Sequence, residues 1–492
     1  MSTLAITSGH VVDPANGIDR VADVVVRDGR IVGVDVPVPA DARIVDASGS
    51  YVSPGWIDGH THVFGDIGLD DPDSAGVLAG VTTVVDAGSS GTLTIDELMV
   101  RSARGRTDVR AVLYLDRRGI ADTATIPTRV EDLPGVPVGE LRRAARRHGE
   151  RIVAVKTGIY ADLGRAWTSL ALATAELVGL PLFVHIGNFS THTSSDVDLM
   201  RDLLRRLRRG DVLTHCYTAQ PGNLLDEDGE LLPEALDAAA RGVVFDLGHS
   251  GAGFDPRVAR TALAAGLRPT TVSSDVAVIN VRQRVRSLAH VMGRVAALGV
   301  ELPELVRSVT LAPARTYGLP GGHLSPGAPA DLTLFDVDPS ATGDGDGDGE
   351  AERFTVRTTV RMGEVIAPDP GAAAASRNIR FRILDAPAEP MVRDVGVARL
   401  LDRLADCLDD VPADGEVLQA IVVHLAAQEV QPLDVASTAV RRAFADRTSG
   451  NPPGWLLAEL RGQRGTSWVV DRLRAAAVLA TPEPDLRRAA AS

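Results

Sequence analysis

The sequence predicts an α/β protein whose centre is a (β/α)8 TIM barrel, with a small β-sandwich made from both flanks of the barrel and a C-terminal helical domain. Three observations predict it. Eight short runs rich in β-branched residues recur between residues 51 and 276, and helical patterns lie between them. Eight such units in about 260 residues have the size of a TIM barrel. The third observation is a pair of β-like regions that flank the centre of the chain.

The flanks are residues 1–54 and 318–370, which we expect to form one β-sandwich subdomain. In the first flank, two apolar runs within 22–34 surround Arg27-Asp28-Gly29-Arg30, which is a hairpin signal. In the second flank, ADLTLFDVD (330–338) and FTVRTTVRMGEVI (354–366) repeat the β pattern.

The barrel is expected over residues 55–317, with strands and helices in alternation. The helical patterns include DLMRDLLRRLRRG (198–210) and DPRVARTALAAG (255–266). The eight strand-like runs are YVSPGWIDGHTH (51–62), TTVVDAG (82–88), VRAVLYLD (109–116), RIVAVKTG (151–158), PLFVHIG (181–187), DVLTHCY (211–217), GVVFDLGH (242–249) and TTVSSDV (270–276).

The last part of the chain has a different pattern. Residues 371–390 are expected to form an Ala/Pro-rich linker, residues 391–480 a small helical domain, and residues 481–492 a flexible tail. Leucines and valines recur at helical spacing in three stretches, and a fourth stretch starts near Trp468. His424 stands there without a cluster of metal-ligand types, so no chemistry is predicted for this domain.

Charge and cysteine content exclude several classes of protein. The formal net charge of −14 over 492 residues argues against a nucleic-acid partner. No apolar run is long enough to cross a bilayer, and MSTLAITSGHVVD lacks the features of a secretory signal. Two cysteines, Cys216 and Cys407, cannot build a disulfide framework. We therefore expect a cytoplasmic protein that binds neither membranes nor nucleic acids.

Lys156 is the only lysine among 51 basic residues. Arginine can replace lysine wherever positive charge is needed, but it is never neutral near pH 7 and cannot react as an amine. A single lysine that survives in so arginine-rich a chain therefore indicates a role that needs an amine, although chance retention at the surface is the alternative.

Residues that can bind metals stand at the ends of the predicted barrel strands. His60 and His62 close the first strand, and two residues that are two apart in a strand point the same way. Each of the six candidates, taken singly, fits a structural role better. Together, at the one rim where barrels carry their active sites, they predict a metal centre. Besides His60 and His62, the candidates are Lys156, His185, His215 and Asp275.

A neutral amine explains how lysine could belong to such a centre. As an ammonium, with an ordinary pKa of about 10.4, Lys156 would repel a cation. A neutral amine can react with carbon dioxide to give an anionic carbamate, whose two oxygens can bridge two divalent ions. Imidazole and carboxylate ligands favour zinc as the metal, although manganese, iron and cobalt also accept them. We expect two divalent ions and a carbamate of Lys156 as cofactors.

These motifs together resemble the amidohydrolase superfamily. The matching segments are PGWIDGHTH, VAVKTG, LFVHIGN, VLTHCY and TVSSDVAV. The chain looks closest to the predicted amidohydrolases and deacetylases related to dihydroorotases and hydantoinases, and FDLGHSGAGFD (245–255) resembles a glycine-rich motif of that branch. The resemblance covers about residues 1–370 and implies a urease-like sandwich beside the barrel.

The resemblance also implies a role for each candidate. His60, His62 and Asp275 would hold the first metal, His185 and His215 the second, and carbamylated Lys156 would bridge the two. The implied reaction is hydrolysis of an acyl amide or ester bond of a small molecule. Asp275 is the implied catalytic residue, because it would accept the proton of the attacking water and pass it to the leaving group.

Departures from the resembled enzymes narrow the substrate. Dihydroorotases carry an Arg just after the second His, whereas Val63 and Phe64 follow His62 here. D-aminoacylases use a Cys at the end of the second strand, where this chain has Asp86-Ala87-Gly88-Ser89-Ser90. Adenosine-deaminase-like members lack the lysine of the fourth strand. Deacetylation of an N-acyl amino acid or an acetylated hydroxy acid is therefore favoured, with opening of a cyclic amide as the alternative.

Weaker signals point to substrate contacts. Tyr160, four residues after the lysine, could bind the substrate carbonyl or simply pack at the start of a loop. His249, Asn188 and Ser89 lie near rim positions, where polar residues also occur for structural reasons. A hypothesis from another class is a scaffold whose helical domain binds a protein partner. The sequence leaves the oligomeric state open, a homo-oligomer included.

Overall fold

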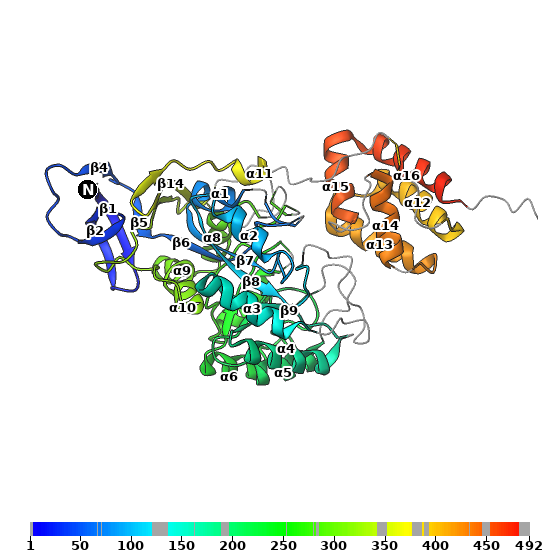
Figure 1. The fold of residues 1–492 in the computed structure, drawn as a ribbon, viewed down its shortest axis with the longest axis horizontal. Coiled ribbons are helices and arrows are strands. Elements are labelled where there is room, and N and C mark those ends of the chain that lie inside the picture. The colour runs from blue at the N-terminus through cyan, green and yellow to red at the C-terminus, as the bar shows by residue number, and fades with distance from the viewer. Residues whose placement is uncertain are drawn as a thin grey trace, which may run out of the picture. The chain divides into compact units, whose positions relative to one another are not determined.

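Strands and helices alternate through the centre of the chain in the computed structural model (Figure 1). The structure describes residues 3–65, 67–69, 71–120, 136–161, 163–187, 196–251, 253–278, 280–281, 285–341, 352–375, 386–387, 393–431, 433–444 and 453–481. Among these, the residues up to 375 form one unit and the residues from 386 form a second. Most of the predicted linker and nearly all of the predicted tail lie outside the described residues.

Seven parallel strands form the central sheet, in the spatial order β12-β11-β10-β9-β8-β7-β6. This order follows the chain, as expected when a crossover connection that contains a helix joins each strand to the next parallel strand. The strands are β6 (Trp56–Thr61), β7 (Val81–Ala87), β8 (Asp108–Tyr114), β9 (Ile152–Gly158), β10 (Leu182–His185), β11 (Val212–Thr214) and β12 (Val244–Asp246).

Residues 271–276 occupy the eighth position of the ring. Thr271 bridges to Asp246 in β12, and Val276 bridges to Thr61 in β6, both in parallel. The segment thus joins the two edges of the sheet. It is not the continuous strand that the sequence predicts for 270–276, because the backbone of Asp275 is left-handed, with φ of 50°, and such a residue interrupts a β ladder.

Side chains alternate between the inside and the outside of this sheet. In β10, Phe183 belongs to an inner apolar cluster, whereas its neighbours Leu182 and Val184 belong to the cluster beneath the helices. The next inward position is His185, at the carboxyl end of the strand. The barrel interior is therefore apolar below and polar at its carboxyl rim.

Helices follow the strands on the outside of the sheet, and α3 to α6 lie side by side there (Figure 1). Aspartates begin three of them: Asp71 accepts from the backbone N–H of Asp73, Asp196 from that of Leu199, and Asp255 from those of Arg257 and Val258. The helices are α1 (Pro72–Ala75), α2 (Ile95–Ser102), α3 (Val138–His148), α4 (Gly164–Val178), α5 (Val197–Arg206), α6 (Pro233–Arg241), α7 (Pro256–Ala264), α8 (Leu288–Ala296), α9 (Leu302–Val309), α10 (Leu311–Tyr317) and α11 (Ala372–Ala375).

A second sheet of eight strands combines both flanks of the barrel sequence. Its order is β15-β14-β13-β5-β1-β2-β3, and β4 pairs with β1. Apolar side chains from the two flanks, among them Ile6, Val24 and Leu332, share one buried cluster. The strands are β1 (Thr3–Asp13), β2 (Ile18–Arg27), β3 (Arg30–Val34), β4 (Arg43–Asp46), β5 (Tyr51–Pro54), β13 (Leu332–Val337), β14 (Phe354–Arg361) and β15 (Glu364–Ile366).

One predicted strand divides between the two sheets. The run at 51–62 becomes β5, which pairs with β13, and β6, which starts the barrel. Gly55 stands between them, and a Cβ added there would lie 2.3 Å from Oγ1 of Thr82. The close approach requires glycine at this position, and it marks the point where the chain passes from one sheet to the other.

The second unit consists of helices around its own apolar core. Leu400, Leu418, Phe444 and Leu473 are among its fully buried side chains. The helices are α12 (Val395–Cys407), α13 (Gly415–Gln428), α14 (Leu433–Phe444), α15 (Pro453–Arg464) and α16 (Thr466–Ala480). The sequence predicts four helical stretches and misses α15, which begins at Pro453, a residue type that suits the first turn of a helix.

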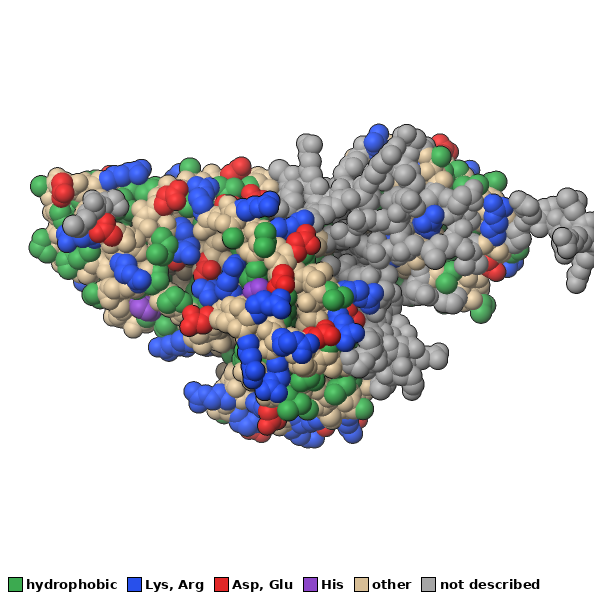
Figure 2. Space-filling view, in the orientation of Figure 1, with side chains coloured by type: hydrophobic (Ala, Val, Ile, Leu, Met, Phe, Trp, Pro, Cys, Tyr) green, Lys and Arg blue, Asp and Glu red, His purple; other side chains and the backbone are tan. Residues whose placement is uncertain are grey.

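Charged side chains of both signs are interspersed over the face of the molecule shown in Figure 2. Among the charged residues of the chain, Arg201 pairs with Glu234 at 2.8 Å and Arg268 pairs with Glu304 at 2.8 Å. Within the described residues, none of the helices has both the length and the apolar character that crossing a membrane would require.

Candidate metal centre

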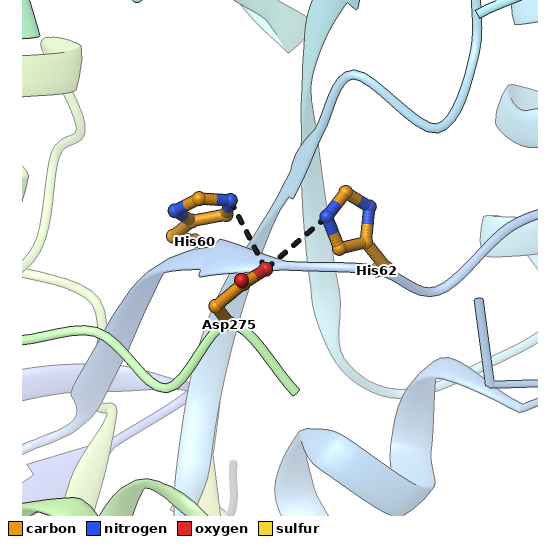
Figure 3. A group of neighbouring side chains, drawn as sticks. All are labelled: His60, His62 and Asp275. Atoms are coloured by element: carbon orange, nitrogen blue, oxygen red, sulfur yellow. Dashed lines mark ion pairs between the residues drawn. The ribbon is translucent and has the colours of Figure 1, made fainter. Parts of the chain in front are cut away.

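Three of the six predicted ligands meet at the carboxyl rim of the barrel (Figure 3). Oδ1 of Asp275 lies 3.1 Å from Nε2 of His60 and 3.2 Å from Nε2 of His62. His60 belongs to β6 and His62 follows it, so their spacing of two places both rings on the inner side. The backbone N–H of Asp275 donates to the carbonyl of His60 at 2.7 Å, which holds the carboxylate beside them.

The other three predicted ligands lie next to this group. Nζ of Lys156, on β9, is 3.0 Å from Nε2 of His60. Nε2 of His215 lies 3.6 Å from Oδ2 of Asp275. The ring of His185, at the end of β10, meets the ring of His215 edge-on with centroids 4.6 Å apart. The structure therefore brings all six residues to one place, on five different segments of the barrel.

Burial favours the neutral form of three of these imidazoles. It lowers the pKa of His60 and His185 well below the ordinary value and also lowers the pKa of His215. A neutral ring carries one lone pair that can bind a metal.

The pKa values of Lys156 and Asp275 are both lowered, and both changes suit a metal centre. Burial lowers the pKa of Lys156 to about 8, although Asp275, Asp86 and Asp246 oppose this. An amine with this pKa has a reactive neutral fraction near pH 7. Burial alone would raise the pKa of Asp275, but His60, His62 and His215 together hold it below the ordinary value. Asp275 therefore stays ionised.

Three of the rings have a polar partner on the side that faces away from the group, and the carbonyl partner of His215 fixes its tautomer. Nδ1 of His215 donates to the carbonyl of Gly248 at 2.7 Å, which leaves its Nε2 unprotonated. Nδ1 of His62 lies 2.7 Å from Oγ of Ser89, and Nδ1 of His60 lies 3.1 Å from Oγ1 of Thr214. A ring nitrogen of His60, a ring nitrogen of His62 and a carboxylate oxygen of Asp275 lie within 4.8 Å of one another in a buried place. This donor set fits a divalent metal such as zinc.

The backbone is unusual at two of these residues. His215 and Asp275 both have left-handed φ angles, of 63° and 50°, although neither is glycine. Nδ2 of Asn280 donates to the carbonyl of Asp275 at 2.8 Å and to that of Ser250 at 3.1 Å. Strain of this kind is kept where the surroundings fix a functional side chain.

The predicted substrate contacts have different surroundings. Tyr160 is buried, with its ring 6.2 Å from that of His185. His249 is also buried and stacks on Phe254 at 5.2 Å. Ser89 is hydrogen-bonded to His62 and so contacts a candidate ligand. Asn188 lies outside the described residues.

Sequence reasoning missed the polar residues beneath the centre. Asp246 is fully buried and lies 3.6 Å from Nδ1 of His60. Asp58 is buried as well, and burial raises its pKa to about 7. The signal was available: Asp58, Thr214 and Asp246 occupy strand positions two residues from inward-facing ones, where an apolar residue is the rule.

Comparison with known proteins gives a family and named relatives. Residues 234–366 match the model of the amidohydrolase family. A deacetylase of Enterococcus faecalis is 32% identical over 346 residues, which cover 68% of this chain and 89% of that protein. A dihydroorotase of Anaeromyxobacter dehalogenans is 28% identical over 407 residues, which cover 69% of this chain and 90% of that protein.

Two crystal structures have a similar fold. An adenine deaminase aligns with a TM-score of 0.66 at 28% identity, over 75% of this chain and all 100% of that chain. A dihydroorotase aligns with a TM-score of 0.64 at 28% identity, over 75% of this chain and 98% of that chain.

Proposed function

Because this chain belongs to the amidohydrolase family, we propose that it is a metal-dependent deacetylase that hydrolyses an acyl amide or ester bond of a small molecule. The single observation that carries the proposal is the convergence of His60, His62 and Asp275, with Lys156 3.0 Å from His60. The deacetylase of E. faecalis, which this chain matches over 89% of its length, supports the choice of reaction.

We propose that the centre holds two divalent ions, with zinc as the first choice. His60, His62 and Asp275 would hold one ion, His185 and His215 the other, and the carbamate that Lys156 forms with carbon dioxide would bridge them. When bound, the metals supply an acidified water and polarise the carbonyl of the substrate. The buried imidazoles and the pKa of Lys156 near 8 support this assignment.

The residues of the chain carry out the proton transfer. Asp275 is ionised, so it can take a proton from the attacking water and return it to the leaving nitrogen or oxygen. Its backbone bonds to His60 and Asn280 fix the carboxylate while the proton moves. His60 and His62, 0% and 3% exposed, exclude bulk water from one side of the reacting group.

Tyr160 and His249 are the proposed substrate contacts on this chain, with Asn188 and Ser89 as weaker candidates. Tyr160 is buried and lies beside His185, which supports a role near the carbonyl oxygen of the substrate.

A cyclic amidase of the dihydroorotase or hydantoinase type is the second candidate. The dihydroorotase of A. dehalogenans and the aligned dihydroorotase structure favour it. Val63 and Phe64 speak for deacetylation, because both are buried and apolar where a dihydroorotase would carry its arginine.

Two finer assignments of the architecture are also proposals. The eight-stranded sheet would correspond to the urease-like sandwich of the superfamily. Helices α12 to α16 would form a separate domain, because their apolar side chains form a cluster of their own, and this domain is the proposed binding site for a protein partner.

The test combines metal analysis with a substrate screen. Purified protein should contain two divalent ions per chain and release acetate from an N-acetyl amino acid or an acetylated hydroxy acid. Hydrolysis of dihydroorotate or hydantoin without deacetylation would favour the cyclic amidase, and release of ammonia from adenine would favour a deaminase. Protein that binds no divalent metal would refute the proposed centre.

A further inference from the structure

We propose that Thr214 and Asp246 are positioning residues that fix His60 in the tautomer that a metal ligand requires. The inference rests on the metal centre proposed above and concerns a part of the site that touches neither metal nor substrate. It follows from the direction of hydrogen bonds that lie entirely among buried groups.

Asp246 is the starting point of these hydrogen bonds. Its carboxylate is fully buried at the end of β12 and has three hydroxyl neighbours. Thr214 and Ser273 lie 2.7 Å and 2.8 Å from its Oδ2, and Thr271 lies 2.7 Å from its Oδ1. A carboxylate can only accept hydrogen bonds, so each hydroxyl donates its single proton to Asp246.

The hydrogen bond from Thr214 to Asp246 determines the direction of the hydrogen bond between Thr214 and His60. Because its proton points to Asp246, Oγ1 of Thr214 can only accept from Nδ1 of His60, at 3.1 Å. The direct separation between Nδ1 of His60 and Oδ2 of Asp246 is 3.6 Å, which is too long for a hydrogen bond. The threonine hydroxyl is therefore the link between the carboxylate and the ring.

The proton on Nδ1 leaves the lone pair on Nε2, which faces the other ligands. Nζ of Lys156, 3.0 Å from this Nε2, is a donor on the opposite side of the ring and favours the same tautomer. The other tautomer would place a proton on Nε2, where it would bond to Oδ1 of Asp275 at 3.1 Å and block the metal position. The Thr214–Asp246 pair disfavours that competing state before any metal arrives.

Two isosteric variants isolate this effect. Thr214→Val removes the hydroxyl that links the carboxylate to the ring, whereas Thr271→Val removes a hydroxyl from the same carboxylate without touching His60. Both remove one hydrogen bond from Asp246, so the second is a matched control for loss of stability. Thr214→Ser keeps the hydroxyl and tests rescue.

The experiment measures the affinity of metal-free protein for Zn²⁺, by competition with a chromophoric chelator, beside circular dichroism and thermal unfolding. Thr214→Val should weaken Zn²⁺ binding about tenfold to a hundredfold, while Thr214→Ser and Thr271→Val keep the affinity of the unaltered protein. In the substrate assay at saturating Zn²⁺, kcat of Thr214→Val should recover, because only metal occupancy is affected.

Each contrary outcome has a distinct meaning. Unchanged Zn²⁺ affinity in Thr214→Val overturns the inference while the proposed function stands. An equal loss in Thr271→Val also overturns it, because the effect would then be general loosening of the barrel. Should the unaltered protein bind no Zn²⁺ at all, the proposed function itself fails.

A second pair of variants guards against a fold defect. Asp246→Ala should weaken Zn²⁺ binding, and adding Thr214→Val to it should weaken binding little further, because both changes break the same connection. If the losses of Zn²⁺ affinity in the double variant are additive, then Asp246 does not act on His60 through Thr214, and the inference is overturned.

Discussion

Replacing Lys156 by methionine removes the amine from the centre of the site and keeps a long, unbranched side chain. Lys156 is 1% exposed, and its Nζ lies 3.0 Å from Nε2 of His60 and 5.1 Å from the centre of the Phe183 ring. Methionine cannot form a carbamate, so the variant should lose metal and activity. In metal-free protein, however, it should be more stable than the unaltered chain, because no charge is then buried.

The size of this gain follows from the pKa. Burial lowers the pKa of Lys156 from 10.5 to about 8, so the ammonium form is disfavoured in the folded state. A tenfold change in a protonation equilibrium is worth about 1.4 kcal/mol, which gives a cost on the order of 3 kcal/mol for the folded ammonium. Lys156→Met should recover most of it.

The pH dependence has a definite sign. Below pH 8, folded and unfolded chains both carry the ammonium, and the full cost applies. As the pH rises from about 8 to 10.5, the folded state releases its proton first, so the cost declines and the advantage of Lys156→Met disappears.

Urea unfolding of chelator-treated protein at pH 7 and pH 10 measures the difference, and metal analysis of untreated protein measures occupancy. Lys156→Arg is the matched variant: a guanidinium cannot lose its charge, so this variant should be less stable than methionine by several kcal/mol, on the order of 3–5. Two metals per chain in either variant, or a metal-free Lys156→Met that is less stable than the unaltered chain at pH 7, would refute the reasoning.

Two further predictions concern the rim of the barrel, and a third concerns Phe335 on β13 of the eight-stranded sheet. Asp275→Asn should lower kcat about 10²–10⁴-fold while circular dichroism stays unchanged, because an amide cannot accept the proton; a kcat within tenfold of the original would contradict that role. Gly88→Ala should lower metal content and activity, since its Cβ would lie 3.0 Å from Cδ of Lys156 at a φ of 90°; unchanged metal analysis would argue against this contact. Phe335→Ala should cost about 3–5 kcal/mol in urea unfolding, because the ring is fully buried between Tyr51 and Trp56; a loss below 1 kcal/mol, roughly the cost of a surface change, would show that the neighbours close the space.

The sequence was sufficient to locate six of the barrel strands, β7 to β12, and the residues that meet at the carboxyl rim. Both follow from short-range rules: strands show as β-branched runs, and a residue at the end of a parallel strand must face the same edge as its counterparts. His60 and Lys156 are 96 positions apart in the chain, yet this rule alone predicts that they meet.

What the sequence did not show depends on contacts between segments. The passage of residues 51–62 from one sheet to the other is set by the close approach of Gly55 to Thr82, and nothing within the segment itself signals that approach. Likewise, the sequence shows that Thr214 and Asp246 are polar residues at inward-facing strand positions, but it does not show which groups they contact. Their arrangement beneath His60 becomes visible only in three dimensions.

The segment 271–276 occupies the last position of the barrel and also contains Asp275. If this segment separates from β6, the carboxylate of Asp275 also moves away from His60 and His62. The closure of the ring and the proximity of Asp275 to His60 and His62 therefore depend on the same segment. A cation bound between β6 and residues 271–276 would stabilise the contact between them and slow the hydrogen exchange of the backbone amides there.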